Sequence, residues 1–179
     1  MPTLDRSRSV LCLIDLQERL VPAVDGGADV VANAARLLAA AEQLRVPVVM
    51  TEQNPKGLGP TVADLAPPEG AVPVASKMEF DACRARGVLD LLPAGHHIVV
   101  AGMEAHVCVL QTVLGLLDRS RRAYVVADAV GSRRPESKAA ALARLDRAGA
   151  EIVTTEMVLF EWLGTAEDPS FKAVIGLVK

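Results

Sequence analysis

A cysteine near the start of a predicted helix is the first candidate for chemistry in this chain. The apolar run from Val99 to Gly102 predicts a buried strand, and Cys108 follows it in a segment whose apolar spacing predicts a helix. A thiol in the first turn of a helix faces unpaired backbone N–H groups and the positive end of the helix dipole, which favour the thiolate. The same N–H groups could hold an oxyanion formed by attack on a carbonyl. The alternative is a buried cysteine with a packing role.

Two charged residues that follow other predicted strands could activate this thiol. Asp15 comes directly after an apolar strand predicted over residues 9–14, and Lys77 directly after one predicted over 72–76. In a catalytic arrangement Asp15 would take the thiol proton, Lys77 would stabilise the two anions, and Cys108 would attack. The alternatives are an aspartate that caps a turn and a lysine that lies solvated on the surface.

Alternating strands and helices must position these residues. Short β-branched runs predict six strands, over residues 9–14, 47–51, 72–76, 97–101, 123–127 and 152–154. Helices are predicted over residues 28–45, 82–92, 106–118 and 135–148 and in the C-terminal segment, with a long loop over 52–70. Strands that are apolar on both faces and alternate with helices indicate a parallel sheet covered on both sides. We therefore predict a three-layer α/β/α sandwich, a doubly wound, Rossmann-like fold whose ligands bind at the carboxyl ends of the strands.

Composition excludes several classes of protein. The 179 residues predict a single domain over 1–179, and the net charge of −3 with scattered Lys and Arg argues against a nucleic-acid partner. The longest apolar runs are too short to span a membrane, and the first residues lack the apolar core of a signal peptide. Cys12, Cys83 and Cys108 are widely spaced and odd in number, which is typical of a reduced, cytoplasmic protein. Cys12 and Cys83 are interpreted as packing residues.

Other polar residues and motifs are weaker candidates for a functional site. The chain has no G-x-S-x-G motif and no P-loop, and Gly57-Leu58-Gly59 lacks the third glycine of a dinucleotide site, so no cofactor is expected. His106 either lines a pocket, starts the helix or makes a subunit contact. Asp128, after the fifth predicted strand, is interpreted as a turn residue.

Three segments resemble the catalytic segments of the isochorismatase-like cysteine hydrolases. They are Ile14-Asp15-Leu16-Gln17, Ser76-Lys77 with Phe80 shortly after, and Gly102-Met103-Glu104-Ala105-His106-Val107-Cys108-Val109. The loop Thr51-Glu52-Gln53-Asn54-Pro55-Lys56-Gly57-Leu58-Gly59-Pro60-Thr61 resembles the isochorismatase domain-containing protein subgroup in particular. The resemblance covers almost the whole chain and keeps the order and spacing of the segments.

This resemblance implies a catalytic triad of Asp15, Lys77 and Cys108. It also implies a cis peptide bond between Met103 and Glu104, with the backbone amides of Glu104 and Cys108 forming an oxyanion hole. The expected activity is hydrolysis of a small amide or related compound through a covalent intermediate on Cys108. The expected partners are a small-molecule substrate and further copies of the same chain.

The substrate pocket is expected to be small. Phe80 and the loop over 52–61 would form its wall, with Gln17 near its mouth and His106 beside it, although Phe80 fits an ordinary core position equally well. The segment Val158 to Leu163 groups the single tryptophan with large apolar residues, and it either packs on its own sheet or forms a subunit interface.

One departure from related enzymes concerns metal binding. Nicotinamidases of this superfamily carry an Asp-x-His metal motif after the second strand, whereas this chain has Thr51-Glu52-Gln53-Asn54-Pro55 and no histidine before His96. We therefore expect no metal, which argues against nicotinamide as the substrate. The alternatives are a nicotinamidase or carbamoyl-amidohydrolase, and a catalytically silent or redox-responsive oligomeric scaffold.

Overall fold

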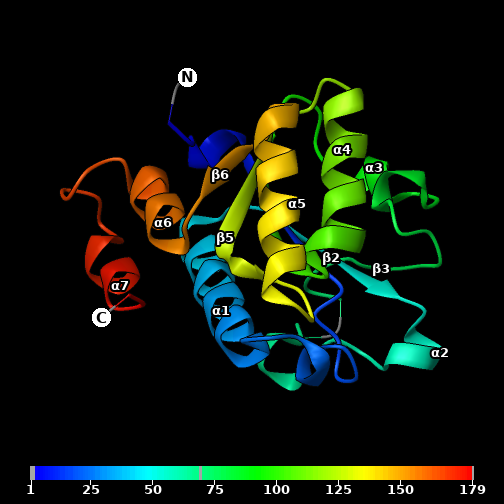
Figure 1. Ribbon diagram of the computed structural model, residues 1–179. Helices are drawn as coiled ribbons and strands as arrows, with labels where there is room; N and C mark the ends of the chain where they lie inside the picture. The colour runs from blue at the N-terminus through cyan, green and yellow to red at the C-terminus, as the bar shows by residue number, and fades with distance from the viewer. Residues whose placement is uncertain (1–2, 69, 179) are drawn as a thin grey trace.

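A six-stranded parallel sheet lies between two layers of helices in the computed structural model of the chain, which describes residues 3–68 and 70–178 (Figure 1). The strands are β1 (Ser9–Ile14), β2 (Val48–Gln53), β3 (Val74–Lys77), β4 (His97–Met103), β5 (Ala123–Gly131) and β6 (Glu151–Val153). They are ordered β3-β2-β1-β4-β5-β6, and each neighbouring pair is parallel. The chain thus winds outward in one direction from β1 and in the other from β4, which confirms the predicted doubly wound sandwich. The switch in direction lies between β1 and β4, where such sheets bind ligands.

The helices differ widely in length. The longer ones are α1 (Gly27–Leu44), α4 (Leu110–Asp118), α5 (Pro135–Ala148) and α6 (Thr155–Leu163), and the shorter ones are α2 (Pro55–Leu58), α3 (Val88–Leu91) and α7 (Phe171–Ile175). Four single turns are 3-10 helical: η1 (Arg6–Arg8), η2 (Val21–Ala23), η3 (Ala63–Leu65) and η4 (Ala82–Arg84). A fifth, η5 (Ala105–Val109), is a π-helical turn that leads directly into α4.

The hydrophobic core has two halves, one on each face of the sheet. Because successive strand residues point to opposite faces, Leu11 and Leu13 pack with α1 and α6, whereas Val10 and Cys12 pack with α4 and α5. All six residues of β1 are buried, as expected for a central strand covered on both sides. In Figure 1, β5 and β6 run between α1 and α6 on one side and α4 and α5, which lie side by side, on the other.

Several predicted elements differ from the structure. The helix predicted over 82–92 is wrong: η4 and α3 occupy this stretch, and Gly87 between them has a φ of 80°, which interrupts a helix. The loop predicted over 52–70 is shorter, because β2 continues through Gln53 and the short helices α2 and η3 follow. Strand β5 runs on to Gly131, beyond its predicted end, and Lys77 is the last residue of β3 rather than the residue after it.

Strands β1 and β4 approach each other very closely at their carboxyl ends. Gly102 pairs with Ile14 and has a φ of +132°, and a Cβ at this position would lie 2.0 Å from the carbonyl oxygen of Ile14. Only glycine fits this contact. It brings the segment after β4, which carries Cys108, next to the end of β1, which carries Asp15.

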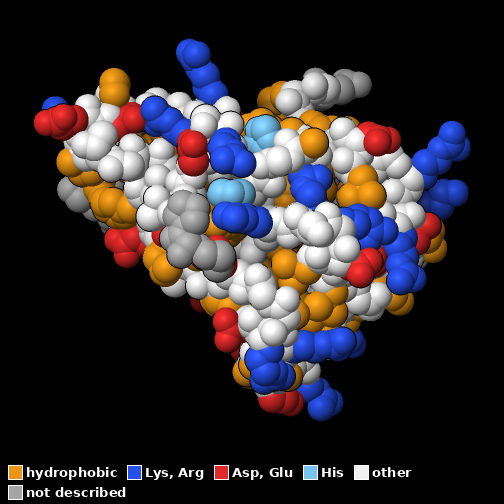
Figure 2. All heavy atoms as spheres, turned by 90° about the horizontal axis from the view of Figure 1, so that it is seen from above, with side chains coloured by type: hydrophobic (Ala, Val, Ile, Leu, Met, Phe, Trp, Pro, Cys, Tyr) orange, Lys and Arg blue, Asp and Glu red, His pale blue; other side chains and the backbone are white. Residues whose placement is uncertain are grey.

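The surface mixes both signs of charge. Figure 2 shows one end of the molecule, where acidic side chains are interspersed with Lys and Arg and histidine side chains lie among them. None of the described helices combines the length and the apolar character needed to cross a membrane.

Candidate active site

A buried ion pair joins the ends of β1 and β3. The Nζ atom of Lys77 lies 2.7 Å from Oδ2 of Asp15, and neither side chain is exposed to solvent. Asp15 follows β1 with a φ of 54°, a left-handed conformation that residues with a Cβ adopt infrequently. Removing both charges from water is costly, and their mutual attraction offsets this only when further hydrogen bonds satisfy the remaining donors and acceptors.

Two polar residues of β2 supply those hydrogen bonds. The hydroxyl of Thr51 donates to Oδ1 of Asp15 at 2.6 Å, and Oε1 of Gln53 accepts from Lys77 Nζ at 2.8 Å. Thr51 and Gln53 are two positions apart in β2, so their side chains point to the same face of the sheet. Because β2 lies between β1 and β3, both side chains reach the ion pair. Gln53 was expected only as part of the loop over 52–61, and no role was predicted for Thr51. The signal that could have found them is the polar run Thr51-Glu52-Gln53 at the end of β2.

Cys108 lies beside this ion pair, in η5, with 5% of its surface exposed. Asp15 and Lys77 are the neighbouring charged groups that act on its thiol. Burial raises the pKa of the thiol to about 12, the charge of Asp15 adds to this rise, and Lys77 opposes it. Burial and a neighbouring carboxylate thus oppose the thiolate that the helix start was expected to favour. The thiol keeps its proton and has a carboxylate next to it.

The turn that carries Cys108 is held by contacts of Glu104. The peptide bond between Met103 and Glu104 is cis. The carboxylate of Glu104 accepts hydrogen bonds from the backbone N–H of Arg133 at 3.1 Å and from its Nε at 3.0 Å. His106 Nδ1 lies 2.9 Å from the hydroxyl of Ser132 and 4.0 Å from Glu104. These contacts tie η5 to the end of β5.

Two of the residues expected around a pocket occupy very different positions. Phe80 is 52% exposed, at the surface beyond β3, and thus does not lie in the core. Gln17 is completely buried and lies inside the molecule rather than at a mouth. Its side-chain amide donates to the carbonyls of Gln53 and Gly59 at 3.1 and 2.6 Å and accepts from the N–H of Gln53 at 2.8 Å. Gln17 therefore fastens the loop after β2 against the end of β1.

Two hollows in the described surface are lined by residues other than Asp15, Lys77 and Cys108. One of about 520 Å³ is lined by His106, Arg133, Arg134 and Ser137, so His106 stands at the edge of a polar depression next to η5.

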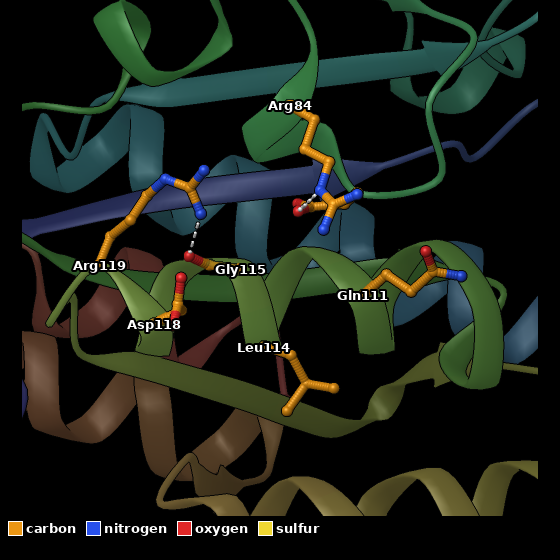
Figure 3. Close-up of a pocket in the computed structure, with 7 residues that line it drawn as sticks. Arg84, Gln111, Leu114, Gly115, Asp118 and Arg119 are labelled. Atoms are coloured by element: carbon orange, nitrogen blue, oxygen red, sulfur yellow. Dashed lines mark hydrogen bonds and ion pairs between the residues drawn. The ribbon is translucent and has the colours of Figure 1, made fainter.

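Another hollow, of about 480 Å³, lies between η4 and α4 (Figure 3). Its charged side chains bind nearby groups: Arg84 lies 3.4 Å from Asp81, and Arg119 donates to the carbonyl of Gly115 at 2.8 Å. It does not contain the candidate catalytic residues.

Asp128 has a structural position. It lies within β5, not in a turn, and its Oδ1 accepts hydrogen bonds from the backbone N–H and the hydroxyl of Thr155 at 2.8 and 3.0 Å. It thereby anchors the start of α6. In the part of the chain that the structure describes, no three His, Cys, Asp or Glu side chains come together as a metal site would require.

Several known proteins are similar to this chain in sequence and in structure. The family model of the isochorismatase domain matches residues 9–157. Human isochorismatase domain-containing protein 2 is 39% identical over 171 residues, which cover 96% of this chain and 83% of that protein. The structure described as MAR1 ribonuclease from Caenorhabditis elegans is 34% identical with a TM-score of 0.92, covering 98% of this chain and 92% of that one. The Escherichia coli YcaC product, described as an octameric hydrolase of unknown specificity, is 23% identical with a TM-score of 0.90, over 98% of this chain and 88% of that one, and shares the fold.

Proposed function

This chain belongs to the isochorismatase family, and from that premise we propose that it hydrolyses a small amide or related compound through a covalent intermediate on Cys108. The observation that supports this most strongly is the buried Asp15–Lys77 pair beside the thiol. If Cys108 only filled space, the two buried charges beside it would cost desolvation free energy without any functional gain. A nucleophile needs a base within reach and a group that orients it.

In the first half of the reaction, Sγ of Cys108 attacks the carbonyl carbon of the amide. The thiol proton passes to the carboxylate of Asp15 as the carbon–sulfur bond forms, so no free thiolate has to exist beforehand. The tetrahedral intermediate then collapses, the carbon–nitrogen bond breaks, and the proton on Asp15 passes to the leaving amine. Lys77 holds the carboxylate in place and balances the negative charge throughout.

In the second half, water attacks the carbonyl carbon of the thioester. Asp15 accepts a proton from this water, and the collapse of the second intermediate breaks the carbon–sulfur bond. The acid product leaves, and the proton returns from Asp15 to the sulfur. We propose that the backbone amides of Glu104 and Cys108 stabilise the oxyanion in both halves.

The substrate that fits this site is small. With 5% of Cys108 exposed, only a short acyl group could approach the sulfur. We propose that Phe80 and the loop over 52–61 form the wall of the pocket, with His106 at its polar side, and that Gln17 acts through the loop it holds. The reaction needs no metal.

We further propose that the protein is a homo-oligomer. Val74, Met78 and Phe80 are 41, 67 and 52% exposed along and beyond the edge strand β3, close to Lys77. A second copy that covers this apolar edge would also enclose the site. Helix α6 buries most of its apolar residues on its own core and leaves Met157 and Phe160 exposed. A sedimentation measurement at micromolar concentration that gives a monomer of 18.9 kDa would contradict this proposal.

Ammonia release from a panel of small amides tests the activity. The panel includes nicotinamide and carbamoyl compounds, which represent the alternative amidohydrolase activities, and Cys108→Ala serves as the matched control. We expect release with at least one amide by the wild type and none by the variant, together with a mass increase on Cys108 during turnover. Release that persists in Cys108→Ala would contradict the proposed nucleophile.

Two other functions are outcomes of the same experiment. A single-stranded RNA is incubated in parallel and its cleavage measured by fragment length, because the C. elegans relative is described as a ribonuclease. A protein that turns over nothing in the panel and never acquires an acyl group on Cys108 would fit the scaffold hypothesis. The three cysteines are free thiols, and we propose a reducing location, the cytoplasm, because oxidation of Cys108 would remove its nucleophilic character.

A further inference from the structure

The hydrogen bonds of Lys77 leave one of its donors unassigned. An ammonium group has three N–H donors in tetrahedral arrangement. One donates to Oδ2 of Asp15 at 2.7 Å and a second to Oε1 of Gln53 at 2.8 Å. With two donors anchored, the group cannot rotate about its terminal bond, so the direction of the third is fixed. Lys77 also acts on the Cys108 thiol through its charge, so we assign the third donor to the sulfur of Cys108.

The carboxylate of Asp15 is also held in one orientation by its hydrogen bonds. Each carboxylate oxygen already accepts one hydrogen bond, Oδ1 from Thr51 at 2.6 Å and Oδ2 from Lys77. These two bonds, on opposite oxygens, hold the plane of the carboxylate. A carboxylate can accept about four hydrogen bonds, so lone pairs remain for the thiol proton.

We propose that Gln53 and Thr51 are positioning residues that orient Lys77 and Asp15 toward the Cys108 sulfur. This inference rests on the proposed nucleophilic role of Cys108. Gln53 suits this role because it is itself immobilised: its Nε2 donates to the carbonyl of Met78 at 2.8 Å, which determines that Oε1 faces the ammonium. Gln17 holds its backbone N–H and carbonyl.

The neutral character of both residues matters as much as their geometry. Cys108 faces one negative charge, from Asp15, and one positive charge, from Lys77. Thr51 and Gln53 hold these groups without adding a third charge, so the site stays neutral overall while the proton moves. A second carboxylate at position 53 would oppose the negative charge that develops on sulfur during attack.

Alkylation of Cys108 by iodoacetamide tests the proposal without a known substrate. Peptide mass spectrometry gives the rate for Cys108 alone, in folded protein, from pH 6 to 9. We expect the wild-type rate to be independent of pH, because Asp15 takes the proton. Gln53→Met keeps the length of the side chain but removes the acceptor, and we expect it to lower that rate about tenfold or more. A rate in this variant within about twofold of the wild type would overturn the role of Gln53.

Thr51 provides a second test should Gln53→Met fail to fold. Thr51→Val preserves the shape and removes the hydroxyl, so the pH-independent rate should fall, and Thr51→Ser should recover most of the loss. A melting temperature that falls while the alkylation rate stays unchanged would show a structural role only and would overturn the proposal. If instead the wild-type rate rises in proportion to hydroxide over the whole range, the proposed function fails, and this inference fails with it.

Discussion

Replacing Asp15 by asparagine gives the sharpest test of the proposed chemistry. The substitution preserves the volume of the side chain but removes the base and the charge opposite Lys77, so Cys108 loses the acceptor for its proton. The structure predicts how the reactivity of the thiol will depend on pH before and after this change.

The magnitude follows from the pKa of Cys108. Burial raises this pKa from an ordinary 9.0 to about 12, so at pH 7 the thiolate fraction is about a thousandfold below that of an exposed cysteine. If only preformed thiolate reacted, alkylation would be slower by a similar factor and would rise about tenfold for each pH unit. If Asp15 accepts the proton during attack, this dependence disappears between pH 6 and 9.

The assay is iodoacetamide labelling of folded wild type and Asp15→Asn, resolved by peptide. We expect a flat profile for Cys108 in the wild type. In the variant the loss of the Asp15 charge removes part of the rise in pKa, so we expect a rate that is lower by about an order of magnitude or more at pH 7 and climbs with pH. Cys12 is an internal control, because it is 1% exposed in β1 and should stay unlabelled while the protein is folded. Parallel profiles in the two proteins would refute the assignment of Asp15 as the base.

Three further predictions concern the ion pair, the contact between β1 and β4, and metals. Lys77→Met leaves the Asp15 carboxylate buried without its counter-ion, so the free energy of unfolding measured in urea should fall by about 3–5 kcal/mol, and a loss below about 1 kcal/mol would contradict the argument. Gly102→Ala places a Cβ 2.0 Å from the Ile14 carbonyl and should yield no folded protein, whereas the control Gly95→Ala, with φ of +74° but nothing within 4 Å, should cost only about 1–2 kcal/mol. Treatment with a chelator should leave the turnover of a verified amide unchanged, and its loss would contradict a metal-independent reaction.

The prediction of the fold succeeded where its signals are local. The apolar runs that form β1 and β4 are each followed by a segment with helical spacing, so a doubly wound parallel sheet could be predicted, whereas the order of the strands within it came from the structure. The helix over 82–92 failed for a local reason as well. Its apolar spacing is helical, but Gly87 in the middle of it adopts a left-handed conformation that interrupts the helix, and apolar spacing does not show this.

The residues that bind the ion pair could not be predicted in the same way. Thr51 and Gln53 stand near the end of a strand whose predicted boundary fell at residue 51, so Gln53 was placed in a loop. Their importance comes from the register of β2 with its neighbours, in which Thr51 pairs with Ile14 and Gln53 with Lys77. Register between strands is a property of the assembled sheet.

By itself the sequence determined the order of strands and helices along the chain and the positions of Asp15, Lys77 and Cys108 near the ends of three strands. It could do so because apolar periodicity and the residues that end each element act over only a few positions of the chain. The tertiary structure decided the burial and the neighbours of those three groups, and therefore their chemical environment. Asp15 and Lys77, 62 positions apart, form a fully buried pair. Their surroundings keep the Cys108 thiol protonated, because desolvation and Coulomb interactions depend on every group that packs nearby, however distant it is in the chain.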